Sequence, residues 1–185
     1  MRIWNPVIVT SLVCETWIHE GFPTHLICPA GFRVIRNDRK NRRGDGVAIF
    51  CRDDWKLEML DKFSSNFECL WVRITTPNSV FYVCSLYHPP EPVYHEEDLL
   101  EFLIDICERI TCKDPNNTVV IGDDVNNLKY KDFLNQSSLT KLVKEPTRKN
   151  KILDVFITNK PFLWKKTQVV QSAVRTDHHM VVNLS

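Results

Sequence analysis

The sequence lacks any strong excess of charge and any long hydrophobic run. Its 24 basic and 23 acidic residues give a formal net charge of +1, so a nucleic-acid partner has to be argued from local patches. The opening residues, MRIWNPVIVTSLVCETW, are too polar for a signal peptide and too short to span a membrane. We therefore expect an intracellular protein, in the nucleus or the cytoplasm, with no membrane partner.

Cysteine pairs and repeats are also missing. The seven cysteines are scattered without a CxxC pair, and most stand in apolar segments such as CLWV and IDICERI. This distribution favours single buried thiols over a disulfide framework or a zinc site. The chain of 185 residues carries no repeat or low-complexity linker. We expect one domain over residues 1–185, long enough to bury a core, and a monomer.

The apolar segments are short and alternate with polar turns, which is typical of a chain built mainly of strands. Residues 96–110 instead have apolar side chains at helical spacing, with acids in the first turn, and predict a helix. A weaker helix is predicted over 130–134. Strands are predicted at 7–13, 46–51, 69–75, 80–87, 118–121, 152–157 and 179–184. Strands this apolar indicate sheets that helices cover on at least one face.

The stretch VVIGDDVNN, residues 119–127, ends an apolar run at two adjacent aspartates. Residues two apart on a strand share a face, so we expect Asp124 and Asn126 to project together and Asp123 to point the other way. A carboxylate that accepts beside a carboxamide that donates suits a water or metal site. A turn built from Asp and Asn explains the same stretch without any chemistry.

Three further fragments place polar groups beside apolar strands. Glu15 in CETWI follows the first strand, where a charge commonly caps the strand or faces solvent. Asp154 stands inside ILDVFITN, where an unpaired charge would be costly. Asp177, His178 and His179 open the last strand. A histidine that pairs with a buried aspartate is suited to general acid catalysis or phosphate stabilisation, because its pKa lies near neutrality.

Taken in order, the motifs ETW, GVAI, LYHPP, D-x-N, LDVFITN and TDHHMVV resemble those of the endonuclease/exonuclease/phosphatase (DNase-I-like) superfamily. The resemblance covers about residues 5–183 and is closest to the endonuclease domain of LINE-type, non-long-terminal-repeat retrotransposons. It implies a four-layer α/β sandwich, in which two mostly antiparallel sheets pack face to face with helices outside. It also implies hydrolysis of DNA phosphodiesters that leaves a 3′-hydroxyl, and a parent polypeptide with a reverse transcriptase.

The resemblance implies roles for individual residues as well. Glu15 and Asp177 match family carboxylates at the metal, normally Mg²⁺ with Mn²⁺ as an alternative, and a hard cation with oxygen ligands would polarise a phosphodiester. Asp124 matches the aspartate that positions or deprotonates the attacking water, and Asn126 matches its partner.

On the phosphate side, Tyr87 matches a tyrosine beside the scissile phosphate. His178 matches the histidine that faces the phosphate, and Asp154 matches the aspartate that orients it. Contacts to nucleic acid are expected for His88, Thr147, Arg42, Arg43 and Arg148. The two neighbouring arginines belong to the basic cluster 33–43, which indicates either a solvated loop or a contact to the DNA backbone. His179 is expected to pack or to lie at the surface.

Two departures from the family pattern bear on activity. The strand that opens the family domain, with its asparagine, has no counterpart before Glu15, and Asn5 is not a match for it. We expect an amino-terminally truncated domain without its first strand, with an unpaired sheet edge. The glycine of the family's GDFN motif becomes Asp123 if Asp124 is catalytic. In the other register Asp123 is catalytic and Val125 replaces the asparagine. Two functions follow: an active endonuclease, or a catalytically impaired nucleic-acid-binding remnant.

Overall fold

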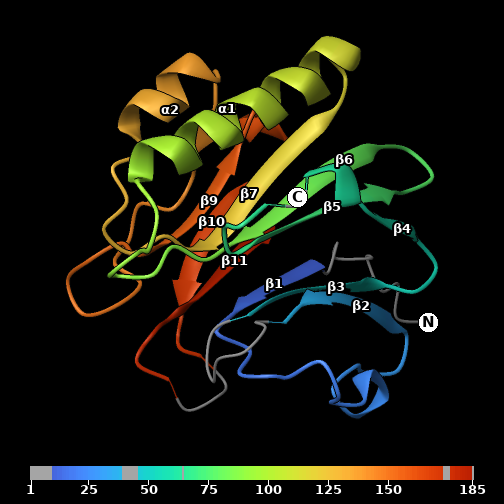
Figure 1. Cartoon of the computed structure of the whole chain (residues 1–185). Coiled ribbons are helices and arrows are strands. Elements are labelled where there is room, and N and C mark those ends of the chain that lie inside the picture. The colour runs from blue at the N-terminus through green and yellow to red at the C-terminus, as the bar shows by residue number, and fades with distance from the viewer. Residues whose placement is uncertain (1–9, 39–45, 64, 173–175, 185) are drawn as a thin grey trace.

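The computed structural model describes residues 10–38, 46–63, 65–172 and 176–184, and its largest sheet has six strands in the order β4-β5-β6-β7-β9-β8 (Figure 1). The six-stranded sheet consists of β4 (Lys56–Met59), β5 (Cys69–Thr75), β6 (Val80–Leu86), β7 (Thr118–Asp124), β8 (Thr140–Lys141) and β9 (Asp154–Thr158). Only β6 and β7 pair in parallel within it. The connection between these two strands contains helix α1 (Glu96–Lys113), because parallel neighbours need a long crossover.

Two smaller sheets cover one face of the six-stranded sheet. The first has the order β1-β3-β2 and consists of β1 (Thr10–Cys14), β2 (Phe32–Asn37) and β3 (Val47–Arg52). The second is the antiparallel pair of β10 (Lys166–Val170) and β11 (Met180–Leu184). Strand β1 contacts β7 and β6, and β11 contacts β9. Short 3-10 turns, η1 (Thr24–Leu26), η2 (Asp61–Phe63) and η3 (Pro161–Leu163), lie in the connections.

The core has two parts, one on each face of the six-stranded sheet. On one face, α1 buries an apolar stripe that includes Leu99, Leu103 and Ile106 against the sheet, and α2 (Lys131–Gln136) packs beside it. On the other face, β3 packs against β5, β6 and β7. Alternate residues of β7 pack into the two parts of the core: Val119 faces the helices and Val120 faces β3. This double burial explains why the strands are continuously apolar.

The sandwich of two mostly antiparallel sheets is confirmed, and the predicted helix and the strand at 69–75 are found in place. Among the described residues both α-helices lie over the six-stranded sheet, and only the turn η1 lies beyond β2 (Figure 1). The reading of residues 33–37 as loop is wrong, because they belong to edge strand β2, where Val34 and Ile35 pair with β3. No described helix has the length and apolar character needed to cross a bilayer.

Strands β1 and β11 are edge strands of the two smaller sheets. β1 pairs with β3 and β11 pairs with β10, and neither strand has a second neighbour among the described residues. Every open sheet ends in such edges, so the absence of the family's first strand stays a prediction. Asn5 and the residues up to 9 lie outside the described residues, as do Arg42 and Arg43.

Candidate active site

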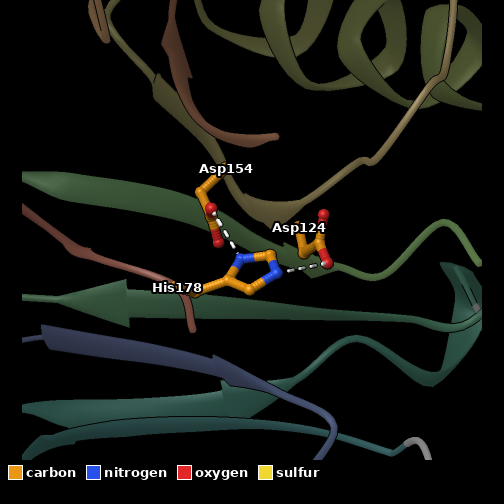
Figure 2. A group of neighbouring side chains, drawn as sticks. All are labelled: Asp124, Asp154 and His178. Carbon is orange, nitrogen blue, oxygen red and sulfur yellow. Dashed lines mark hydrogen bonds and ion pairs between the residues drawn. The ribbon is translucent and has the colours of Figure 1, made fainter. Parts of the chain in front are cut away.

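Three side chains meet where β7, β9 and the segment before β11 come together. Asp124 and Asp154 are direct cross-strand partners on β7 and β9. The imidazole of His178 lies between their carboxylates, as Figure 2 shows. Its Nδ1 is 2.9 Å from Asp154 Oδ2, and its Nε2 is 3.9 Å from Asp124 Oδ2. Ligand atoms from these three residues lie within 4.8 Å of one another, so they are also able to hold a metal ion.

Asn126 completes the carboxylate side of this group. Its backbone N–H donates to Asp124 Oδ1 at 2.9 Å, and its Nδ2 donates to Asp124 Oδ2 at 3.1 Å and to the backbone oxygen of His88 at 2.9 Å. The pKa of Asp124 is raised to about 6. Burial is the main cause and the charge of Asp154 adds to it, while the hydrogen bond from Asn126 and the charge of His178 oppose the shift. The pair Asp124–Asn126 therefore forms one oriented unit at the end of β7.

Thr147 holds the second carboxylate in place. Its side-chain oxygen accepts hydrogen bonds from the backbone N–H groups of Leu153 and Asp154, both at 3.0 Å. Its backbone oxygen accepts from His179 N–H at 2.7 Å, so the same residue also anchors the segment that carries His178. Thr147 is 0% exposed. The predicted nucleic-acid contact does not fit this burial, and the residue supports the site from beneath.

Glu15 and Tyr87 lie on the other side of Asp124. Glu15 follows directly on β1 with a φ of 49° and is exposed. Tyr87 is buried, and its hydroxyl hydrogen-bonds to Glu15. Burial raises the pKa of Tyr87 well above its usual value, and the charges of Glu15 and Asp124 add to the effect. Tyr87 thus links the carboxylate of Glu15 to the neighbourhood of Asp124.

Two other predicted residues form an ion pair. Asp177 Oδ2 accepts from Arg148 Nε at 2.7 Å and lies 2.6 Å from its second guanidinium nitrogen. The guanidinium lowers the pKa of the Asp177 carboxyl. The carboxylate therefore faces Arg148, and it does not belong to the group of metal-ligand atoms described above. Both side chains are exposed to solvent, so the predicted contact of Arg148 to nucleic acid stays a prediction.

His88 differs from its predicted role. Its ring is only 2% exposed, and Nδ1 lies 3.0 Å from the hydroxyl of Tyr94. Burial lowers the pKa of His88, and the charge of Glu96 opposes that shift. The predicted contact between this side chain and phosphate does not fit a buried ring. The backbone of His88 contributes instead, because its oxygen orients Asn126 and its N–H donates to Asp124 O at 3.0 Å.

Asp123 and Asp124 have separate partners, although strand alternation is not the reason. Regular alternation would turn Asp123 toward the helices, on the face of Val119 and Ile121. Its φ of 105° breaks that pattern. The carboxylate instead accepts from Ser85 Oγ at 2.7 Å and hydrogen-bonds to Cys14. The geometry therefore favours the register in which Asp124 and Asn126 form the D-x-N pair.

Ser85 was not singled out from the sequence, although a lone hydroxyl in the apolar strand VFYVCSLY was a usable signal. Cys14 was read only as a buried thiol. It is partly buried, and its thiol pKa is raised by burial and by Asp123. Both residues lie directly behind the site and hold Asp123, which makes them part of its support.

No family model matches the chain, and no curated protein matches it in sequence. Solved structures do match. The endonuclease domain of TRAS1, a telomere-specific non-LTR retrotransposon, aligns with 95% of this chain and 84% of its own, at 21% identity and a TM-score of 0.69. Truncated TDP2 from Caenorhabditis elegans aligns with 93% of this chain and 82% of its own, at 11% identity and a TM-score of 0.63.

A 3′ phosphatase, NExo from Neisseria, solved with a product DNA hairpin, aligns with 94% of this chain and 87% of its own, at 13% identity and a TM-score of 0.62. At identities this low, the likeness shows a shared fold and no more. The retrotransposon-type motifs and these structures point to the same architecture. The chain therefore has the DNase-I-like fold of the endonuclease/exonuclease/phosphatase superfamily, as its sequence motifs predicted.

Proposed function

We propose that the chain is a divalent-metal-dependent phosphodiester hydrolase that nicks DNA, of the retrotransposon endonuclease type. The observation that carries the proposal is the imidazole of His178 held between Asp154 and Asp124. A histidine that is hydrogen-bonded to one carboxylate and lies 3.9 Å from a second combines an oriented hydrogen-bond donor with a base for water. The likeness to the TRAS1 endonuclease domain and to a DNA-bound phosphatase supports DNA as the substrate class.

Asp124 and Asn126 would act on the attacking water. Asp124 has two oxygens held by Asn126, so a water that donates to the remaining lone pairs would lie in a fixed direction. Ionised Asp124 takes the proton as the water oxygen bonds to phosphorus. The bond from phosphorus to the 3′ oxygen breaks, and that oxygen takes up a proton from solvent water, which leaves a 3′-hydroxyl and a 5′-phosphate.

His178 and Asp154 would stabilise the charge that develops on the phosphate. The Nδ1–H group of His178 donates to Asp154 Oδ2, which fixes the ring and directs Nε2 toward Asp124. In the imidazolium form Nε2–H is a donor at the place where a non-bridging phosphate oxygen would become more negative. Tyr87, beside Glu15, would supply a further hydroxyl near the same phosphate.

The donor set fits Mg²⁺, and Mn²⁺ as an alternative. Glu15 is exposed at the edge of the site, and Asp124 has its pKa raised to about 6 by burial and by neighbouring carboxylates. Oxygen ligands that repel one another are a suitable environment for a hard cation. When bound, the cation would supply charge to polarise the phosphodiester. Asp177 would join Glu15 only if its pair with Arg148 opens.

The test is nicking of supercoiled plasmid by purified protein with Mg²⁺. We expect Asp124→Ala and His178→Ala to abolish nicking. Asp132→Ala, which removes an exposed carboxylate on α2, should leave it unchanged. The nicks should be sealed by DNA ligase, because ligase needs a 3′-hydroxyl and a 5′-phosphate. Nicking by Asp124→Ala at the rate of the unaltered protein would refute the proposal.

A second function is a nucleic-acid-binding module with an impaired site. The observation that favours it is the pair Arg148–Asp177, which withdraws one of the two predicted metal ligands. On this reading the protein shifts the mobility of DNA in a gel but does not nick plasmid with Mg²⁺ or Mn²⁺.

A further inference from the structure

Asp123 occupies a backbone position that is costly for an aspartate. A φ of 105° lies in the region that favours glycine, and a side chain there is strained by about 1–3 kcal/mol. The carboxyl group is also partly buried, and this burial raises the pKa of Asp123 to about 6. Two unfavourable features in one residue require an interaction that offsets them.

The offsetting interaction joins three strands from two sheets. Ser85 on β6 donates its hydroxyl to Asp123 Oδ2 at 2.7 Å. Cys14, the last residue of β1, hydrogen-bonds to the same carboxylate through both its thiol and its backbone. β1 is an edge strand, so Asp123 satisfies a backbone donor at an otherwise open edge. We call Ser85, Asp123 and Cys14 the clasp.

The neighbouring residue shows how closely the strands approach. A Cβ added to Gly122 would lie 2.6 Å from Leu12 Cδ1, so β1 lies directly on β7 at this point. Leu12 and Cys14 share a face of β1 because they are two residues apart. The apolar contact at Gly122 sets the distance between the strands, and the clasp fixes the end of β1.

We propose that Asp123 is a positioning residue: through the clasp it holds the end of β1 on β6 and β7, and so fixes Glu15 beside Tyr87 and Asp124. The inference rests on the proposed function, since Glu15 matters there as a metal ligand. Glu15 is the residue after Cys14, and Tyr87 lies two residues after Ser85. A change at Asp123 therefore reaches both partners of the Glu15–Tyr87 hydrogen bond.

The opposite interpretation is that Asp123 damages the site by standing in place of a glycine. Asp123→Gly separates the two. Glycine relieves the strain at φ 105° and removes the carboxyl, while Ser85 and Cys14 lose their acceptor, so both interpretations predict a variant that still folds. The clasp predicts that the Mg²⁺ concentration for half-maximal nicking rises about 10- to 100-fold, as for other residues that orient metal ligands. The damage interpretation predicts unchanged or faster nicking.

Asp123→Asn is the matched control. It removes the same negative charge but keeps one of the two acceptor oxygens, and its NH2 group is able to donate to the Ser85 hydroxyl or the Cys14 sulfur. Asparagine also tolerates positive φ better than most residues. We expect its Mg²⁺ requirement to stay close to that of the unaltered protein. Ser85→Ala, which removes the donor from β6, should move the requirement in the direction of Asp123→Gly.

A second readout does not depend on activity. Iodoacetamide alkylates accessible cysteines, and peptide mass spectrometry measures how much of Cys14 is labelled. A low extent of labelling reports that the end of β1 stays packed on β6 and β7, and buried Cys51 on β3 is the internal reference. Asp123→Gly should raise the labelling of Cys14 well above that of Asp123→Asn, although both lack the charge. Equal labelling of the two variants, or undiminished Mg²⁺ response in Asp123→Gly, would overturn the inference. If the unaltered protein fails to nick, labelling alone decides it.

Discussion

Replacing Thr147 by valine tests whether the site depends on one buried hydroxyl. Thr147 is 0% exposed, and its oxygen is the acceptor for two backbone N–H groups at 3.0 Å each. Valine keeps the shape and removes the acceptor, so no large cavity forms. Each N–H group left unsatisfied costs about 1–3 kcal/mol. We expect Thr147→Val to lower the free energy of unfolding by about 2–4 kcal/mol.

Urea unfolding followed by far-ultraviolet circular dichroism measures this change. In a chain of 185 residues, a loss of this size lowers the melting temperature by roughly 5–15 °C. Thr147→Ser is the matched control, because it keeps the hydroxyl and loses only a methyl group, at about 1 kcal/mol. A Thr147→Val variant within about 0.5 kcal/mol of the unaltered protein, or a serine variant as unstable as the valine one, would refute the reasoning.

Three further predictions concern the site itself. Asp154→Asn should leave the fold intact and slow plasmid nicking about 10²- to 10⁴-fold, because an amide no longer fixes the donor at His178 Nδ1. The unaltered protein should be more stable than His88→Gln by a constant free energy above about pH 7, and this difference should shrink below about pH 6.5. In that range the unfolded histidine takes up a proton, while the buried ring, with its lowered pKa, stays neutral. Mg²⁺ should stabilise the unaltered protein by about 1.4 kcal/mol per tenfold increase above the dissociation constant, and so raise its melting temperature, but not that of Asp124→Ala; differential scanning fluorimetry measures both.

The elements predicted from sequence are those whose pattern is local. Helix α1 follows from its stripe of apolar residues, and β5 from a continuous apolar run between turn residues. Strands β4, β8 and β10 were missed because they are short or polar, such as KLEM and KTQVV, and are held by their neighbours rather than by their own composition. Residues 33–37 were misread because their arginines outweighed the adjacent apolar residues Val34 and Ile35.

The site was predictable to the extent that it depends on residue type. Asp124, Asn126, Asp154 and His178 were found from motifs, and the structure brings them together. The supporting contacts were not predictable, because they depend on register and on one unusual backbone angle. Thr147 was expected to contact nucleic acid and lies buried under β9, and Asp177 was expected at the metal and pairs with Arg148. A single sequence carries no local signal for such partners 29 residues apart.

The three carboxylates at the end of β7 and the start of β9 explain why the fold alone does not decide activity. Burial raises the pKa of Asp123 and of Asp124 to about 6, and the charge of Asp154 contributes to both shifts. Their native pKa values near 6 mean that, between about pH 4 and 6, the folded state holds protons that the unfolded state has lost, so stability falls as the pH rises through that range. At neutral pH the site therefore carries unfavourable charge that a cation would relieve. The same repulsion that destabilises the folded protein at neutral pH would favour metal binding. The clasp at Asp123 decides whether Glu15 is placed to take part.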